Sequence, residues 1–235
     1  MFLYIIRHGD PIYDPDSLTP LGERQAEAVG RRLSEIGLDR IYCSPLIRAR
    51  QTAQPTCEML RMEPQIEEWT SEELAWRDFA CDLPDGGYSW AFHAQNTTFN
   101  TKECRALGEK WYEDPAFAKI DGKAAYQRIM DASDEFIARQ GYRRDGLIYH
   151  VERPNDDRVA VFCHQGFGVT WLSHLLQIPP QMFWASFDIT YTSVTIIEFA
   201  NNKDGITQPK CLCLSDVSHI YAERLPMVYN REKRI

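Results

Sequence analysis

The chain has 235 residues, of which 44% are hydrophobic and 26% charged, and its formal net charge is −8. This length and balance predict one globular domain with a sizeable buried core. The acidic charge argues against a nucleic-acid partner, and no apolar run approaches the ~20 residues of a membrane span. Only six residues precede Arg7, fewer than a secretory signal needs. We therefore expect a cytoplasmic protein that binds neither membrane nor nucleic acid.

The first third of the chain alternates apolar runs with amphipathic helical patterns. Residues 2–6 predict a buried strand, and residues 11–17 carry turn chemistry. Thr19 can serve as N-cap and Pro20 suits the first helical position, which predicts a helix from there to Gly37.

The same alternation continues to residue 69. A second strand is expected over residues 40–43, a second helix from Ser44-Pro45 through about Leu60, and a third strand over residues 65–69. This order predicts an α/β fold with three layers, α/β/α, in which helices cover both faces of a mostly parallel, doubly wound sheet.

Residues 70–120 break this rhythm, because aromatic and polar residues occur there without a clean period. We interpret them as an insertion that caps the active-site end of the sheet, within a single domain spanning residues 1–235. A helix is expected over residues 121–140, and a loop or edge hairpin over residues 144–157.

The last third returns to regular elements. Residues 159–163 predict a strand, and residues 168–176 a helix that Pro179-Pro180 ends. Two further strands are expected over residues 193–199 and 211–214. Seven cysteines are scattered along the chain without a CxxC pair, so we expect buried free thiols rather than a zinc site or a disulfide framework.

Basic side chains stand at the ends of three predicted strands. Arg7-His8 ends the first strand, Cys163-His164 ends a later one, and Arg48 lies one helical turn beyond Ser44-Pro45. Ligand sites of open α/β sheets lie at the carboxyl ends of the strands. Arginines suit phosphate oxygens, and a histidine nitrogen can attack phosphorus. The sequence therefore predicts a phosphate pocket at this edge.

Five segments resemble the motifs of the histidine phosphatase superfamily, the phosphoglycerate mutase-like proteins. They are Arg7-His8-Gly9, the helix start over residues 18–26 (LTPLGERQA), the segment over residues 44–53 (SPLIRARQTA), Phe162-Cys163-His164, and the strand residues 192–195. They occur in the same order as in the family, and the stretch from the first to the last covers most of the chain.

The resemblance implies roles for five residues. His8 corresponds to the nucleophile that becomes phosphohistidine, and Arg7 and Arg48 to the arginines that clamp the phosphoryl group. His164 corresponds to the second histidine of the pocket, and the backbone N–H of Gln165 to a further phosphate donor. No metal or organic cofactor is implied, and the expected partner is a small phosphorylated substrate.

The general acid is less sharply defined by the sequence. The family usually supplies it after the third strand, where Glu72 and Glu73 are adjacent candidates. We favour Glu72, because some relatives carry the acid three residues beyond a tryptophan comparable to Trp69. Asp10 is better explained as a loop cap or as support for the first motif.

Two departures from the family pattern weaken a mutase assignment. Asp14 stands where many relatives carry a phosphate-binding Asn, and a carboxylate there would repel phosphate unless the loop turns it away. The loop between His8 and Thr19 is also short. In addition, Gln165 replaces a common Gly and places a side chain at the pocket mouth.

The insertion is expected to set specificity. Six aromatic residues can line an apolar surface above the phosphate, and three basic residues can bind a second anion: Trp76, Phe79, Tyr88, Trp90, Phe92 and Phe99, and Arg77, His93 and Lys102. We predict a metal-independent phosphomonoester hydrolase of the histidine acid type. A mutase and a low-activity phospho-ligand-binding regulatory protein are the alternatives. The substrate and the oligomeric state stay open.

Overall fold

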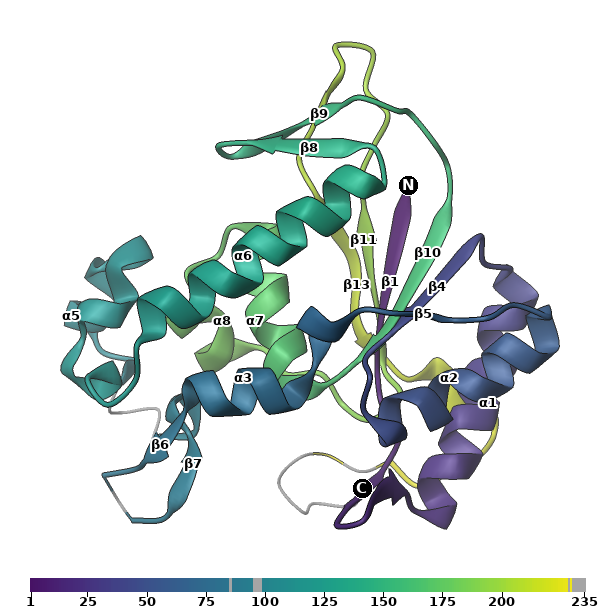
Figure 1. The fold of residues 1–235 in the computed structure, drawn as a ribbon, viewed down its shortest axis with the longest axis horizontal. Helices are drawn as coiled ribbons and strands as arrows, with labels where there is room; N and C mark the ends of the chain where they lie inside the picture. Colours follow the sequence, from purple (N-terminus) through teal and green to yellow (C-terminus); the bar gives the residue numbers. More distant parts are fainter. Residues whose placement is uncertain (85, 95–98, 228, 230–235) are drawn as a thin grey trace.

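A six-stranded sheet forms the centre of the protein (Figure 1). The computed structural model describes residues 1–84, 86–94, 99–227 and 229. The strand order is β13-β11-β1-β10-β4-β5. The pairs β1–β10, β10–β4 and β4–β5 are parallel, and β11 is antiparallel to both of its neighbours. The mostly parallel α/β sheet predicted from the sequence is therefore confirmed. The strands are β1 (Phe2–Arg7), β4 (Arg40–Cys43), β5 (Gln65–Ile66), β10 (Arg158–Cys163), β11 (Val194–Glu198) and β13 (Lys210–Asp216).

Different helices bury the two faces of the sheet. In β1, Leu3 and Ile5 belong to one hydrophobic core, while Tyr4 and Ile6 belong to another. Successive strand residues point to opposite faces, which explains why this strand is apolar throughout. The first core includes α6 (Gly122–Arg139) and α7 (Gln165–Leu176), and the second includes α1 (Pro20–Ile36) and α2 (Ile47–Leu60).

The start of α1 is built as the sequence predicts. The side chain of Thr19 accepts a hydrogen bond from the N–H of Gly22, and Pro20 occupies the first helical position. Gly37 ends the helix with φ 77°, a backbone conformation that favours glycine. Gly22 also brings the helix against the Gly9 turn, because a Cβ added to Gly9 would lie 2.7 Å from the Gly22 carbonyl oxygen.

Several boundaries differ from the sequence expectations, including that of α7, which begins at Gln165 rather than at Gly168. The second helix begins at Ile47 rather than at Ser44-Pro45, and the third strand stops at Ile66. Residues 68–70 instead form a 3₁₀ turn (η1, Glu68–Thr70) that packs Trp69 against Phe136. Pro180 begins a further helix, α8 (Pro180–Ser186), because proline suits the first helical position as well as it ends a preceding helix.

The insertion is mostly helical and packs around an aromatic core. Within its described residues it comprises α3 (Glu72–Phe79), β6 (Ala80–Asp82) paired with β7 (Tyr88–Trp90), η2 (Ala91–His93), α5 (Lys102–Ala106), η3 (Gly108–Glu113) and η4 (Pro115–Phe117). Phe79, Phe92, Trp111 and Phe117 contact Trp184 of α8. These contacts anchor the insertion against α8 (Figure 1). Residues 85 and 95–98 of the expected insertion lie outside the described residues.

Besides the β6–β7 pair, two further small sheets occur among the described residues. A hairpin of β8 (Tyr142–Asp145) and β9 (Ile148–Val151) pairs with β12 (Ile206–Thr207) in a separate sheet, rather than lying at the edge of the main one. A second hairpin, β2 (Pro11–Tyr13) with β3 (Asp16–Leu18), follows the first motif. The short helix α9 (Ser218–Ala222) packs on α1. Among the described helices, none is long and apolar enough to cross a membrane.

Candidate active site

The predicted histidines meet at the carboxyl ends of neighbouring strands. Arg7 pairs with Cys163 in the β1–β10 ladder, and the N–H of His8 donates to the Cys163 carbonyl at 2.9 Å. The ring centroids of His8 and His164 are consequently 5.2 Å apart. At the end of β4, Ser44 Oγ lies 2.7 Å from Nε2 of His164. The topology therefore brings together two histidines that are far apart in the sequence.

A hydrogen bond sets the tautomer of His8. Its Nδ1 lies 2.7 Å from the carbonyl oxygen of Gly9. Because a carbonyl oxygen only accepts, the proton of the neutral ring belongs on Nδ1, and the lone pair of Nε2 is left available. The Gly9 N–H donates to Thr52 Oγ1 at 2.9 Å, which holds this turn against α2.

Both histidines are held neutral. Burial lowers the pKa of His8 well below its ordinary value, and the charges of Arg7 and Arg48 lower it further. Burial also lowers the pKa of His164, with added effects of His8, Arg48 and Arg7. Nδ1 of His164 is buried and has no hydrogen-bond partner among the described residues.

The two arginines are buried and oriented by different neighbours. Nη1 of Arg7 donates to the Ile189 carbonyl at 2.9 Å, and its guanidinium lies 4.0 Å from the ring centroid of Tyr191. Nη1 of Arg48 donates to Asp16 Oδ1 at 2.7 Å, while its Nε is buried without a partner in the described part of the chain. Their exposed fractions are 3% and 7%, so both charges are concentrated inside the site.

Glu72 joins α3 to the first turn of α7. Its two carboxylate oxygens each accept a backbone N–H at 2.9 Å, one from Gly166 and one from Phe167. Burial raises the pKa of Glu72, although these hydrogen bonds and the arginine charges oppose the shift. The neighbouring Glu73 is exposed. The geometry therefore favours Glu72 as the carboxyl group of the site.

Gln165 begins α7 next to these groups. Glu72 takes the N–H groups of Gly166 and Phe167, and the N–H of Gln165 precedes them at the start of the helix. Its side-chain Nε2 donates to Asp188 at 3.0 Å. A helix N-terminus, two arginines and two neutral histidines together form a site suited to an anion.

A family model of the histidine phosphatase superfamily (branch 1) matches residues 3–81 and 100–210. The chain belongs to the histidine phosphatase superfamily. Among curated proteins, "Probable phosphoglycerate mutase GpmB" of Erwinia tasmaniensis is 26% identical over 111 residues, which cover 36% of this chain and 52% of that protein. "Fructose-2,6-bisphosphatase TIGAR" of Xenopus tropicalis is 35% identical over 74 residues, 27% of each chain. The matches therefore span about half or less of these relatives.

Solved histidine phosphatase structures share the fold. A mycobacterial glucosyl-3-phosphoglycerate phosphatase superposes with a TM-score of 0.60 at 18% identity, covering 92% of this chain and 99% of the other. A phosphoserine phosphatase from Entamoeba histolytica gives 0.59 at 20% identity, covering 93% and 98%. At these identities the likeness establishes the three-layer fold alone.

The candidate site contains a further polar residue that no sequence pattern indicated. Asp16 contacts Arg48 through Oδ1 and accepts the N–H of Ile47 through Oδ2, both at 2.7 Å. It thereby caps α2 from the β2–β3 hairpin, since Leu46 at the N-cap position has no polar side chain. Asp14, which the family comparison singled out, is exposed. The sequence marked this segment only as a turn.

The structure shows a polar partner or an exposed position for each of the remaining polar residues proposed from the sequence. Asp10 accepts a hydrogen bond from Thr19 Oγ1 at 2.7 Å, which makes it a loop cap. Arg77 pairs with Asp78, and His93 lies 3.2 Å from Ser89 Oγ. Lys102 is exposed in the first turn of α5. In the described residues, His, Cys, Asp and Glu form no group of three that could hold a metal ion.

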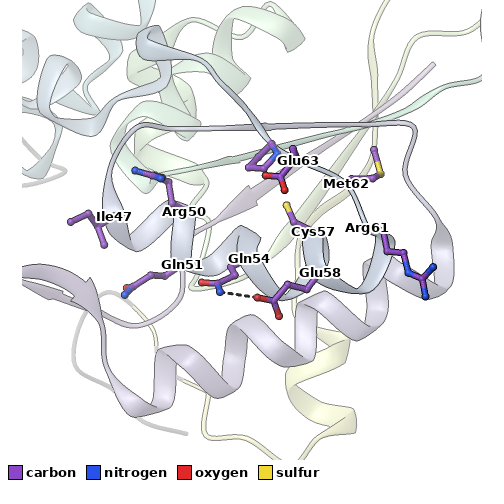
Figure 2. Close-up of a pocket in the computed structure, with 10 residues that line it drawn as sticks. Ile47, Arg50, Gln51, Gln54, Cys57, Glu58, Arg61, Met62 and Glu63 are labelled. Atoms are coloured by element: carbon purple, nitrogen blue, oxygen red, sulfur yellow. Dashed lines mark hydrogen bonds between the residues drawn. The ribbon is translucent and has the colours of Figure 1, made fainter.

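A separate groove of about 750 Å³ runs along the outer face of α2 (Figure 2). Arg50 and Gln51 lie on this face, whereas Arg48 of the same helix is buried. Burial raises the pKa of the groove's Cys57 to about 11, which keeps its thiol protonated and unreactive. The groove is thus distinct from the histidine pair. Its lining is Ile47, Arg50, Gln51, Gln54, Cys57, Glu58, Arg61, Met62, Glu63 and Pro64.

Proposed function

We propose that this histidine phosphatase superfamily member is a metal-independent phosphomonoester hydrolase that forms a phosphohistidine on His8. The observation that carries the proposal is the setting of His8. Its Nδ1 is tied to the Gly9 carbonyl, and burial together with the charges of Arg7 and Arg48 lowers the pKa of the ring, which favours its neutral form. A neutral imidazole with a free Nε2 lone pair is the form that attacks phosphorus.

The proposed reaction has two steps. In the first, Nε2 of His8 bonds to phosphorus, the ester P–O bond breaks, and Glu72 gives its proton to the departing alcohol oxygen. In the second, the Glu72 carboxylate takes a proton from water while the water oxygen attacks the phosphohistidine. The N–P bond then breaks, His8 regains its lone pair, and inorganic phosphate leaves.

The other site residues stabilise charge on the phosphoryl group. Arg7 and Arg48 would hold its oxygens through charge-assisted hydrogen bonds. The N–H of Gln165 would donate at the helix start. His164 would donate to an oxygen on which charge develops in the transition state. Because these donors are buried, water screens their charges less, and their interactions with the phosphoryl oxygens are stronger.

The covalent step is open to direct test. Rapid acid-free quenching of the enzyme during turnover of a ³²P-labelled aryl phosphate is expected to trap label on the peptide that contains His8. The label should be lost in acid and survive in alkali, as a phosphoramidate requires. Label on a carboxylate or hydroxyl group, or a burst of product without label, would refute the phosphohistidine.

A mutase is the second candidate, because one relative is named as a probable phosphoglycerate mutase. A mutase returns the phosphoryl group to an isomerised product, whereas a hydrolase releases inorganic phosphate. Product analysis with a panel of phosphorylated metabolites separates the two. If neither phosphate release nor isomerisation occurs, but phosphorylated ligands bind, the chain acts as a ligand-binding regulatory protein.

Asp16 provides a further prediction. Asp16→Ala is expected to lower the free energy of unfolding by about 3 kcal/mol, because it leaves the buried Arg48 charge unpaired and α2 without its cap. Inorganic phosphate should recover more stability in this variant than in the wild type, since the anion would replace the missing carboxylate. Urea unfolding with and without phosphate measures both effects.

The hairpin supplies the matched control for this prediction. Asp14→Ala removes an exposed carboxylate from the same hairpin, and it should alter neither the unfolding free energy nor its phosphate dependence appreciably. An Asp16→Ala variant that phosphate stabilises less than the wild type would show that the carboxylate assists anion binding rather than balancing Arg48.

A further inference from the structure

Two aromatic side chains of the insertion are exposed beside the site, although most of their neighbours are buried. Trp76 on α3 is 37% exposed and Tyr88 on β7 is 59% exposed. The other four aromatic residues proposed from the sequence, Phe79, Trp90, Phe92 and Phe99, are at most 7% exposed. The insertion therefore presents two rings to solvent and uses the rest as core.

A chain of contacts connects Glu72 to Trp76. The Gly166 N–H donates to Glu72, and a Cβ on Gly166 would lie 2.7 Å from the Trp90 ring. The ring centroid of Trp90 is 4.9 Å from that of Trp76, which in turn is 5.7 Å from that of Tyr88. The rings of Trp90, Trp76 and Tyr88 thus form a row that begins at the first turn of α7, where Glu72 accepts its hydrogen bonds.

The spacing of residues along α3 also places Trp76 next to Glu72. Trp76 follows Glu72 by four residues, so both side chains lie on one face of the helix, with Cβ atoms about 6 Å apart. In the proposed reaction Glu72 protonates the leaving oxygen, and the first carbon of the leaving alcohol must therefore lie next to its carboxyl group. A larger alcohol extends from there towards Trp76.

The chemistry of this surface is apolar and planar. Arg77, the basic residue next to Trp76, forms an ion pair with Asp78. Trp76 and Tyr88 meet edge to face, which leaves ring surface available for a third planar group. Resting on the proposed phosphatase function, we infer that Trp76 and Tyr88 form the leaving-group subsite, and that the substrates are phosphomonoesters of alcohols bearing an aromatic or other planar apolar group.

Binding of two phosphonates, which need not be hydrolysed, tests this subsite. By titration calorimetry the wild type should bind 2-naphthylmethylphosphonate about 10-fold or more tightly than methylphosphonate, since ring contacts contribute about a factor of ten in affinity. Trp76→Ala should reduce this ratio to about 2 or less, and Tyr88→Ala should reduce it about threefold. Trp76→Phe should restore most of the wild-type ratio, because a planar ring is regained.

Tyr221→Ala serves as control, because Tyr221 is 84% exposed on α9, and it should keep the wild-type ratio. Equal affinities of the wild type for the two phosphonates would overturn the subsite, as would a ratio unchanged in Trp76→Ala. Failure of the proposed function looks different: phosphonates bind with the expected ratio, but the matching phosphate esters release no phosphate. Absence of binding by either phosphonate would overturn both proposals.

Discussion

Replacing His8 with alanine is expected to reduce phosphate release from every ester by at least about 10⁴-fold, because the covalent route through the phosphohistidine is lost. No other side chain in the described site has the same combination of a neutral ring and an unshared Nε2 lone pair. Nε2 of His164, by contrast, lies 2.7 Å from Ser44 Oγ. Steady-state rates with an aryl and an alkyl phosphate measure the effect.

The His8→Ala variant should still bind inorganic phosphate, since Arg7 and Arg48 are unchanged. Calorimetric binding and a normal circular dichroism spectrum would separate loss of chemistry from loss of fold. His150→Ala is the matched control, because His150 pairs with Asp145 on the β8–β9 hairpin, outside the site. Activity of His8→Ala within about 10-fold of wild type would remove His8 as nucleophile.

The sequence was sufficient to place the basic residues of the site. Arg7, His8 and His164 stand at the ends of the short apolar strands β1 and β10, and Arg48 is the second residue of α2, the helix that follows β4. Parallel strands order their carboxyl ends along one edge. Local patterns that predict strands therefore also predict which distant side chains lie together, even though the sequence does not show which strands pair.

Other features depend on contacts that no local pattern reveals. Asp16 and Arg48 are 32 residues apart, and Glu72 and Gly166 are 94 apart. Asp16 also follows turn residues that carry no helical or strand period. Similarly, six aromatic residues of the insertion are alike in sequence. Only tertiary packing, such as that of Phe79 and Phe92 against Trp184 of α8, separates the buried rings from Trp76 and Tyr88.

The burial of Glu72 has a consequence for pH dependence, because burial raises the pKa of its carboxyl group even though the hydrogen bonds from Gly166 and Phe167 oppose the shift. As the acid of the first step, Glu72 must be protonated, and its raised pKa extends the protonated form to higher pH. The lowered pKa of His8 keeps that ring neutral at lower pH. Activity towards alkyl phosphates should therefore fall as pH rises through the pKa of Glu72, and a bound phosphoryl dianion would raise that pKa further.

Glu72→Gln is expected to slow alkyl phosphates by about 10² to 10⁴-fold, because glutamine cannot donate a proton to a poorly acidic alcohol. Aryl phosphates with acidic phenols should lose less than about 10-fold in the phosphorylation step, since their leaving groups need little protonation. The fall of alkyl phosphate activity with rising pH should disappear as well. Single-turnover rates over a series of leaving groups measure the first step separately from the second.

The bonds from Gly166 and Phe167 also give Glu72 a structural role, which the same variant disturbs. The amide oxygen of glutamine can accept from one N–H, but its NH₂ group cannot accept from the other, so stability should fall by about 1 kcal/mol. If Glu72 were purely structural, its substitution would slow the hydrolysis of all esters by the same factor. Glu73→Gln is the matched control, because its side chain is exposed and its substitution should leave the leaving-group dependence unchanged. If Glu73→Gln selectively slows alkyl phosphates while Glu72→Gln slows all esters equally, Glu73 is the acid and Glu72 serves α7 alone.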